Sequence, residues 1–211
     1  MSALQSHSTI FGLLRHGQTV WNKERRIQGS GNSDLTPEGI TSCRNWGQHL
    51  STSEITWHRI IASPLQRARE TAQLVNEALQ LPIESDEEIR EQHWGTWEGL
   101  TLEQIKSDSP GKLEELIHRG WNFRPPGGES RRELLDRVLA SLRVSSDRWP
   151  GENLLIISHL GVIKSLLYFI EGRNYLPEEP RIVYKNRFHT VGHTNGMFSI
   201  LRKNITLPDL P

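Results

Sequence analysis

Three short apolar runs predict strands that are buried on both faces. They are continuous rather than alternating, which is typical of strands in a parallel sheet covered by helices on both sides. The runs are Ile10–Leu14, Arg59–Ala62 and Asn153–Ile157. The segment Thr190–Leu201 is predicted to form a final strand that closes a sheet edge or meets a partner.

Between the predicted strands, apolar residues recur every three or four positions, as they do on one face of a helix. One such helix is expected to start at Thr36, which caps the first turn, with Pro37 following. Strands alternating with amphipathic helices predict an α/β sandwich around a largely parallel sheet. The four helix faces are Ile40, Cys43, Gly47, Leu50; Leu65, Ala68, Ala72, Val75, Leu79; Leu134, Leu135, Val138, Leu139, Leu142; and Val162, Ile163, Leu166, Leu167, Ile170.

The stretch Leu81–Glu129 does not follow this alternation and is rich in Trp, Gly and Pro. It is interpreted as an excursion of short helices and loops over one edge of the sheet. No repeat, linker or low-complexity tract interrupts the chain, so residues 1–211 are predicted to form a single domain.

The charge of the chain excludes several classes of protein. Its 25 basic and 25 acidic side chains give a net charge of zero, which argues against a nucleic-acid-binding protein and a polybasic membrane-surface protein. Any strong positive field must therefore be local. One cysteine, the absence of a secretory signal and the absence of a long apolar run lead us to expect a soluble cytoplasmic protein.

Basic side chains follow the three predicted strands directly. Arg15-His16 follows the first, Ser63 to Arg67 the second and Ser158-His159 the third. Ligands of an open α/β sheet bind beyond the carboxyl ends of its strands, where helix N-termini point outward. Guanidinium groups match phosphate oxygens in a bidentate way, so the sequence predicts a site for a small phosphorylated metabolite.

Seven segments together resemble the histidine phosphatase superfamily, in the branch that includes cofactor-dependent phosphoglycerate mutase. They occur in the order of that family and span about residues 9 to 201. The resemblance implies a three-layer α/β/α fold, a phosphohistidine intermediate and no metal or cofactor. The segments are Leu14–Asn22, Ile27–Gly29, Asp34–Gly39, Ser63–Ala68, Glu91–Gly99, Pro126–Ser130 and Ser158–His159.

The resemblance also implies a role for individual residues. His16 would attack phosphorus and must be neutral at the attacking nitrogen, so its other ring nitrogen should donate to a nearby backbone carbonyl. Arg15, Arg67 and His159 would hold the equatorial phosphate oxygens, and Glu91 would protonate the leaving oxygen. Substrate contacts are expected from Asn22, Gln28, Gly29 and the Leu160 backbone.

Two carboxylates compete for the role of proton donor. Glu91 is preferred over Glu98 because it fills the family position, while Glu98 is expected to order its loop. A proton donor near neutral pH needs a raised pKa, and desolvation by Trp94 and Trp97 would supply it.

The sequence departs from the family pattern at two positions. Gln18 stands where the family most often has glutamate, and Leu160 where it often has glycine. These changes bear on the identity of the substrate rather than on the mechanism.

Four functions are weighed against one another. Hydrolysis of a small phosphomonoester is preferred over mutase activity, because Leu100–Arg124 is short and lacks the paired arginines of the mutases. A non-catalytic phospho-ligand binding module is disfavoured because the nucleophile and proton donor are both retained. A metal hydrolase is also disfavoured, because His189 and His193 lack cysteine partners and are expected at the surface or in turns. The oligomeric state is left open.

Overall fold

The core of the protein is a six-stranded sheet with the order β3-β2-β4-β1-β5-β6. A computed structural model describes residues 8–207. The first four strands in chain order pair in parallel, while β5 is antiparallel to both β1 and β6. The strands are β1 Ser8–Arg15, β2 Arg59–Ala62, β3 Ile83–Ser85, β4 Leu154–Ser158, β5 Phe188–Thr194 and β6 Met197–Ile205.

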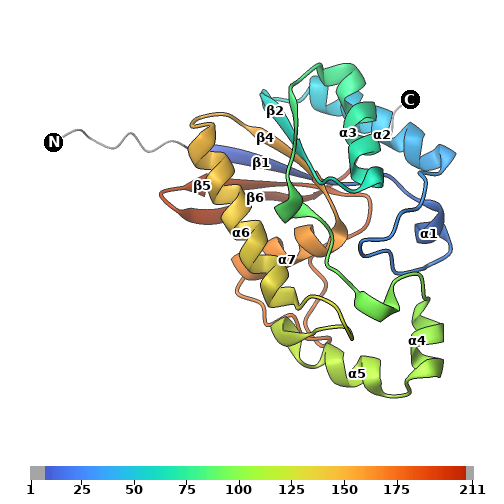
Figure 1. Ribbon diagram of the computed structural model, residues 1–211. Helices are drawn as coiled ribbons and strands as arrows, with labels where there is room; N and C mark the ends of the chain where they lie inside the picture. The colour runs from blue at the N-terminus through green and yellow to red at the C-terminus, as the bar shows by residue number, and fades with distance from the viewer. Residues whose placement is uncertain (1–7, 208–211) are drawn as a thin grey trace.

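Helices cover both faces of this sheet (Figure 1). The pair α2 (Pro37–Ser51) and α3 (Gln66–Leu79) lies on one face, and α6 (Arg131–Arg148) and α7 (Leu160–Ile170) lie on the other. The predicted three-layer α/β/α sandwich with a mostly parallel sheet is confirmed. The shorter helices are α1 Val20–Lys23, α4 Leu102–Asp108 and α5 Lys112–Ile117, with 3-10 turns at Glu87–Ile89, Gly95–Trp97 and Gly120–Asn122.

The position of β4 in the centre of the sheet explains why its sequence is continuously apolar. Leu154 and Ile156 pack in the core beneath α6 and α7, whereas Leu155 and Ile157 pack in the core beneath α2 and α3. Successive side chains of a strand point to opposite faces, and here both faces are covered. Full burial of one such side chain contributes about 1.5–3 kcal/mol.

Helix α2 starts where its sequence predicts. The Thr36 hydroxyl accepts a hydrogen bond from the Gly39 amide at 3.0 Å, and Pro37 occupies the first helical position. Cys43 is a free, buried thiol in the core between α2 and the sheet, as predicted for a core residue.

The interpretation of Leu81–Glu129 as lying wholly outside the sheet is wrong at its start. Residues Ile83–Ser85 form β3, an edge strand paired with β2. With only three residues, β3 is too short to show a periodic pattern. The rest of the stretch extends beyond the carboxyl ends of the parallel strands (Figure 1). Its own small core consists of Trp97, Ile105, Leu113, Leu116 and Phe123.

The prediction of one strand over Thr190–Leu201 is also wrong, because β5 and β6 form a hairpin. Both turn residues, Asn195 and Gly196, have positive φ, and Asn-Gly is the dipeptide that favours such tight hairpin turns. His189 and His193 are not surface or turn residues. They lie in β5 with 1% and 6% of their surface exposed. His193 Nδ1 lies 3.0 Å from Ser146 Oγ of α6, the helix on that face of the sheet, and His189 Nδ1 accepts from the Asn204 amide of β6 at 3.2 Å.

No helix within residues 8–207 is long and apolar enough to cross a membrane.

Candidate active site

A cavity of about 310 Å³ opens where the neighbouring parallel strands β2, β4 and β1 end. Eight of the nine site residues predicted from the sequence line it: Arg15, His16, Asn22, Gln28, Gly29, Arg67, Glu91 and Leu160. The ninth, His159, is fully buried behind His16, with 5.2 Å between the centroids of the two rings. Side chains that are far apart in the chain therefore meet around one small cavity.

His16 is held as a neutral imidazole with a defined tautomer. Its Nδ1 lies 2.8 Å from the Gly17 carbonyl oxygen, which can only accept, so Nδ1 carries the proton. The lone pair of Nε2 accepts a hydrogen bond from Arg67 Nε at 3.3 Å. Burial first, and then the positive charges of Arg15 and Arg67, hold the pKa of His16 well below its usual value of 6.5.

The loop that carries His16 is anchored at both sides. The His16 amide donates to the Ser158 carbonyl of β4 at 2.9 Å, and the Gly17 amide donates to Thr71 Oγ1 of α3 at 2.9 Å. A side chain at Gly17 would lie 2.6 Å from the Cys43 sulfur. Glycine therefore allows the loop to pack closely against α2, and the position of the imidazole follows from this packing.

Arg67 lies in the first turn of α3 and is 1% exposed. Its Nη1 donates to the Gly31 carbonyl and its Nη2 to the Gly29 carbonyl, both at 2.8 Å. Burial lowers the pKa of Arg67 to about 10, so the guanidinium remains charged near neutral pH. Arg67 thus joins α3, the Gly29–Gly31 loop and His16 through a single planar group.

Two buried nitrogen atoms at the site have no hydrogen-bond partner within residues 8–207. They are Arg15 Nε and His159 Nδ1. His159 Nε2 lies 2.7 Å from Ser63 Oγ, and burial, followed by the charge of Arg67, holds the pKa of His159 well below 6.5. An unpaired buried polar atom costs free energy, and a tetrahedral oxyanion beside His16 would supply acceptors for such atoms.

The Glu91 carboxylate sits at the N-terminus of α7. Its Oε2 accepts from the Gly161 amide at 3.3 Å and its Oε1 from the Gln92 amide at 2.9 Å. A β-carbon at Gly161 would lie 2.2 Å from Glu91 Oε1, so only glycine leaves room for this approach. Arg137 of α6 supports Glu91 from behind by donating to its backbone carbonyl at 3.2 Å.

Glu98 has a different environment from Glu91. Its Oε1 accepts from the Ser30 amide at 2.9 Å and from the Trp94 amide at 3.0 Å, and so it ties two loops together as expected. Trp94 lines the cavity together with Glu91. Trp97 instead packs in the small core of the excursion. It was expected beside Glu91, but it is not among the residues that line the cavity.

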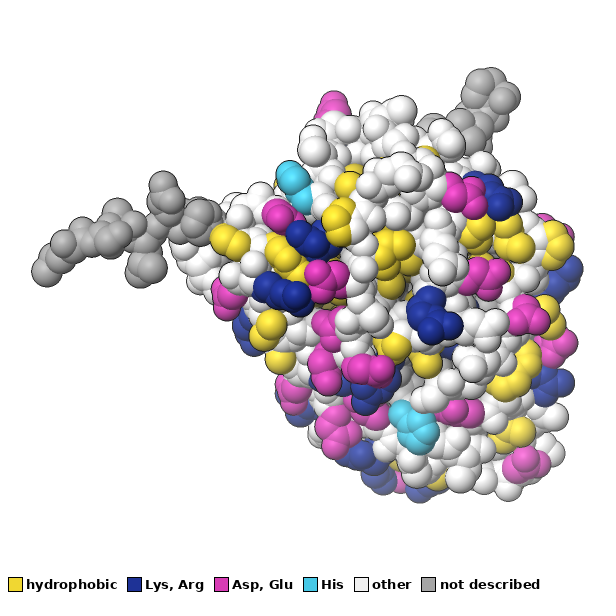
Figure 2. Space-filling view, turned by 45° about the horizontal axis from the view of Figure 1, so that its top comes forward, with side chains coloured by type: hydrophobic (Ala, Val, Ile, Leu, Met, Phe, Trp, Pro, Cys, Tyr) yellow, Lys and Arg dark blue, Asp and Glu magenta, His cyan; other side chains and the backbone are white. Residues whose placement is uncertain are grey.

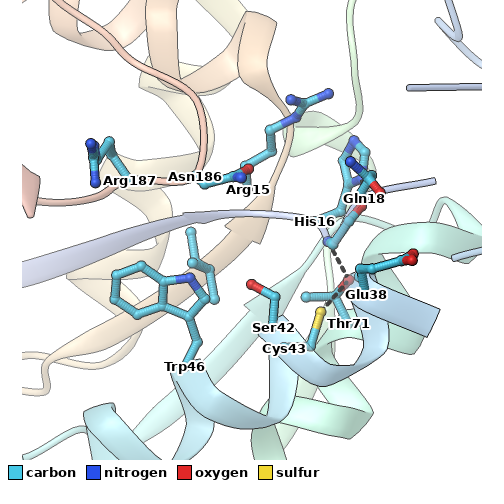
Figure 3. A pocket seen from close by; sticks show the side chains of 13 residues that line it. Arg15, His16, Gln18, Glu38, Ser42, Cys43, Trp46, Thr71, Asn186 and Arg187 are labelled. Atoms are coloured by element: carbon cyan, nitrogen blue, oxygen red, sulfur yellow. Dashed lines mark hydrogen bonds between the residues drawn. The ribbon is translucent and has the colours of Figure 1, made fainter. Parts of the chain in front are cut away.

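Gln18 faces a second, smaller cavity rather than the one around His16. This cavity has a volume of about 100 Å³ and lies beneath the His16 loop, between α2 and the Asn186-Arg187 segment (Figure 3). Gln18 Oε1 accepts a hydrogen bond from the Thr36 hydroxyl at 3.0 Å. In Figure 3 the Arg15 guanidinium and the His16 ring point away from this side. Glutamine in place of glutamate at position 18 therefore changes the surroundings of the His16 loop. It does not change the wall of the larger cavity that contains Arg67 and Glu91.

The four predicted substrate contacts differ in the hydrogen-bonding groups that they leave free for a ligand. Asn22 Oδ1 accepts from the Thr19 amide at 3.2 Å in a capping box, which leaves Asn22 Nδ2 as a donor. Gln28 Nε2 donates to Thr19 Oγ1 at 2.8 Å, and its Oε1 is buried without a partner within the described residues. The Gly29 carbonyl is occupied by Arg67. Leu160 is the first residue of α7.

Several residues of the cavity wall escaped the sequence analysis. Lys164 carried a usable signal, because it lies four positions after Leu160 and so shares its helix face. Arg131 also carried a signal, because it directly follows Pro126–Ser130, one of the segments that resemble the family. With Arg15 and Arg67, the lining has five cationic side chains and one carboxylate. The residues not identified from the sequence are Arg26, Ile27, Gln92, Arg131, Gly161, Lys164 and Tyr175, whereas Trp94 was expected beside Glu91.

This concentration of charge contrasts with the outer surface. In the view of Figure 2, basic and acidic side chains alternate over the visible face. This face therefore shows no extended basic patch, as expected if the positive field of a chain of zero net charge is confined to the cavity lining. Within residues 8–207 no group of three or more His, Cys, Asp or Glu side chains is placed to hold a metal ion.

Comparison with protein families gives one match along most of the chain. The model described as histidine phosphatase superfamily (branch 1) matches residues 11–206. Among curated proteins, the chain is 31% identical over 175 residues to "Uncharacterized phosphatase PhoE" of Bacillus subtilis (strain 168), covering 83% of this chain and 84% of that protein. It is 36% identical over 147 residues to "Probable phosphoglycerate mutase GpmB" of Salmonella choleraesuis (strain SC-B67), covering 70% and 67%.

Solved structures share the same fold. YhfR of Bacillus stearothermophilus has a TM-score of 0.84 and 31% identity, and the match covers 94% of this chain and 98% of that one. The mycobacterial glucosyl-3-phosphoglycerate phosphatase Rv2419c, in complex with VO3, has a TM-score of 0.79 and 27% identity, with 95% and 100% covered.

Proposed function

Because the chain belongs to the histidine phosphatase superfamily (branch 1), we propose that it hydrolyses small phosphomonoesters through a phosphohistidine intermediate, with no metal in any step. The observation that carries the proposal is the set of hydrogen-bond partners of the two His16 ring nitrogens. Nδ1 is protonated against the Gly17 carbonyl, and Nε2 keeps its lone pair toward a cavity that Arg15, Arg67 and Glu91 also line. Relatives named as phosphatases support the same reaction.

In the proposed first step, the lone pair of His16 Nε2 attacks phosphorus and the bond from phosphorus to the alcohol oxygen breaks. The transition state carries charge on three equatorial oxygens. Arg15 and Arg67 would donate to these oxygens, with Arg67 Nε transferring its hydrogen bond from Nε2 to the phosphoryl group. His159 Nδ1 would contribute a third contact from behind His16.

The leaving alcohol needs a proton, and among residues 8–207 Glu91 is the one carboxyl group in the cavity lining. In the proposed reaction Glu91 gives its proton to the leaving oxygen. In the second step it takes a proton from a water molecule that attacks the phosphohistidine, which releases phosphate and restores neutral His16. Protons and charge then balance over the two steps.

The excursion favours hydrolysis over phosphoryl transfer to a second hydroxyl. Its basic side chains are engaged with glutamates and none of them lines the cavity. The mutases carry paired arginines in this stretch to hold the reorienting product, and although Arg26, Arg131 and Lys164 line the cavity, none of them comes from the excursion. The pairs are Arg90 with Glu87, Lys106 with Glu114, Lys112 with Glu115, Arg119 with Glu115, and Arg124 with Glu133.

The direct test is a panel of phosphomonoesters assayed for phosphate release with the wild-type protein and a His16→Ala variant. We expect the variant to lose at least 97% of the turnover, about a 30-fold loss or more. The wild-type protein should also form an acid-labile, base-stable phosphoenzyme that the variant does not form. Residual turnover above a few per cent would show that His16 is not the nucleophile.

The two alternative functions give different results. Incubation with 3-phosphoglycerate should release phosphate, whereas efficient isomerisation without hydrolysis would establish a mutase. A non-catalytic binding module would bind phosphomonoesters without forming any phosphoenzyme in rapid-quench labelling.

A further inference from the structure

Glu91 lies in a segment that belongs to neither a helix nor a strand. The segment, residues 90–94, runs from the 3-10 turn Glu87–Ile89 to the 3-10 turn Gly95–Trp97. No regular ladder of backbone hydrogen bonds therefore fixes the direction in which the Glu91 side chain points. A proton donor must be held within a fraction of an ångström of its working position, so other elements have to supply that precision.

The side chain of Arg137 reaches this segment from α6. Helix α6 packs against the turn that leads into the segment (Figure 1), and the Arg137 side chain is only 9% exposed. Its Nη2 donates to the Glu91 carbonyl oxygen at 3.2 Å, and its Nη1 donates to the Glu88 carbonyl oxygen. One guanidinium therefore holds the backbone of the proton donor and of the turn before it.

The same guanidinium forms a bidentate ion pair with Glu129. Its Nε donates to Glu129 Oε1 at 2.7 Å, and its Nη2 donates to Glu129 Oε2 at 2.9 Å. Such bidentate pairs are short, and they fix the relative orientation of both groups. A lysine at position 137 would keep the charge but could not form this fork. Glu129 therefore sets the direction in which Arg137 presents its remaining N–H groups.

Glu129 also holds the two residues that follow Glu91. Its amide donates to the His93 carbonyl at 2.8 Å, and its Oε2 accepts from the His93 amide at 3.4 Å. Its carbonyl accepts from Nε2 of the buried Gln92 at 2.7 Å. The Gln92 amide in turn donates to Glu91 Oε1 at 2.9 Å. The hydrogen bonds thus run without a break from Glu129 to the carboxylate of Glu91.

Neither residue of the Glu129–Arg137 pair is among those that line the cavity in the described part of the chain. Their influence on a reaction in the cavity must therefore pass through the residues that they hold. Arg137 holds the backbone of Glu91, and Glu129 holds Gln92 and His93. Of these three residues, Glu91 and Gln92 line the cavity, and of those two only Glu91 can give up a proton.

We propose that Glu129 and Arg137 are positioning residues for the proton donor, and that their ion pair holds the Glu91 carboxylate where its proton reaches the leaving oxygen. The inference rests on the proposed phosphatase function, in which Glu91 is the proton donor. Gly161 of α7 contacts the carboxylate itself, whereas the pair holds the backbone from which that carboxylate projects. Both supports are needed, because a shift of the backbone would carry the carboxylate away from the Gly161 amide.

Two substrates with different leaving groups test the proposal, n-butyl phosphate and p-nitrophenyl phosphate. Butoxide needs a proton as it leaves, whereas p-nitrophenolate does not. The quantity to compare is kcat/KM, because it covers the steps up to formation of the phosphohistidine and excludes its hydrolysis. Arg137→Lys keeps the positive charge and removes the fork. We expect its kcat/KM to fall about 30-fold or more on n-butyl phosphate and less than about threefold on p-nitrophenyl phosphate.

Two further variants separate positioning from general damage to the fold. Glu129→Gln keeps the shape of the side chain and the backbone hydrogen bonds of Glu129 but removes its charge. It should show the same selective loss on n-butyl phosphate, about tenfold. Arg132→Gln is the matched control, because Arg132 is exposed on α6 and lies outside the cavity lining. This control should leave kcat/KM unchanged on both substrates.

A double variant shows whether the pair acts through Glu91. In a Glu91→Gln background, Arg137→Lys should cause no further loss on n-butyl phosphate, because the group that it positions no longer donates a proton. Losses that multiply in the double variant would overturn the proposal. Equal losses of Arg137→Lys on the two substrates, or no loss in either variant of the pair, would also overturn it. All three outcomes leave the phosphatase function standing. If the wild-type protein hydrolyses neither substrate, the phosphatase function fails and the positioning role fails with it.

Discussion

At the scale of single residues, Arg67 combines structural and chemical roles. Its three nitrogens donate to His16 Nε2 and to the carbonyls of Gly29 and Gly31. A lysine has the same charge but presents a single ammonium and not a planar fork. Charge alone therefore cannot replace the geometry that aligns the imidazole and the loop.

We expect Arg67→Lys to lower kcat about 100-fold, because one preorganised donor to the transition state is misplaced. Steady-state kinetics with p-nitrophenyl phosphate would measure the change. Arg44→Lys is the matched control, since Arg44 is exposed on α2 and pairs with Glu77 at the surface. A kcat for Arg67→Lys within threefold of wild type would contradict the role given to the guanidinium fork.

At the scale of elements, the N-terminus of α7 places the proton donor. The first turn of this helix follows His159, and its second residue, Gly161, gives its amide to Glu91. The closeness of the carboxylate depends on the absence of a β-carbon at Gly161. One helix end thus holds Glu91 beside the cavity and, one turn later, presents Lys164.

We expect Gly161→Ala to displace Glu91 and to lower kcat about 100-fold on alkyl phosphates, as a shift of about 1 Å can do. On p-nitrophenyl phosphate the loss should be much smaller, because its leaving group needs no proton. Glu91→Gln should show the same dependence on the leaving group.

Unfolding in urea checks that Gly161→Ala keeps the fold. Its free energy of unfolding should remain within about 1 kcal/mol of wild type, since alanine is a good helix former. Equal losses of kcat on the two kinds of substrate would argue against Glu91 as the proton donor.

At the scale of the whole molecule, the fold buries several imidazoles in neutral form. His16 and His159 are buried at the active site, and His189 is buried in β5, where its Nδ1 accepts from the Asn204 amide at 3.2 Å. Burial lowers the pKa of His189 to about 4. The unfolded chain, with a pKa near 6.5, binds the extra proton between these two values. The stability that depends on neutral His189 is therefore fully present well above pH 6.5 and is lost as the pH falls through this window.

We expect the free energy of unfolding to fall between pH 7 and pH 5, with about 2 kcal/mol of the fall due to His189. Urea unfolding at a series of pH values would measure it. His189→Gln keeps an acceptor for the Asn204 amide and does not titrate, so its pH dependence should be shallower by that amount. Identical pH dependence in the two proteins would exclude His189 as a contributor.

The local sequence was sufficient for the layers of the fold. The burial of β4 on both faces, the Thr36 cap and the apolar faces of four helices depend on neighbours within a few residues, and these predictions agree with the structure. The motifs at the ends of β1, β2 and β4 also identified Arg15, His16 and Arg67 of the cavity lining, together with His159 buried behind it. Such patterns can be recognised in the sequence because the position of a residue within a strand or helix determines the side to which its side chain points.

The family resemblance supplied the roles of Glu91 and the first-loop residues, which no spacing in the chain implies. Two features of the fold remained hidden for different reasons. The edge strand β3 has only three residues, and pairing with β2 defines it. The hairpin of β5 and β6 had a local signal in Asn195-Gly196 that was missed, which left His189 and His193 wrongly placed.

The sequence by itself determined the alternation of strands and helices and the chemical types gathered at the strand ends. Only the tertiary structure decided that Glu91 would meet Gly161, that His159 would lie behind His16, and that Arg131, Lys164 and Tyr175 would share one wall. The physical reason is that these contacts join segments tens of residues apart. Their distances depend on how closely whole elements pack, and no local pattern of residues encodes that packing.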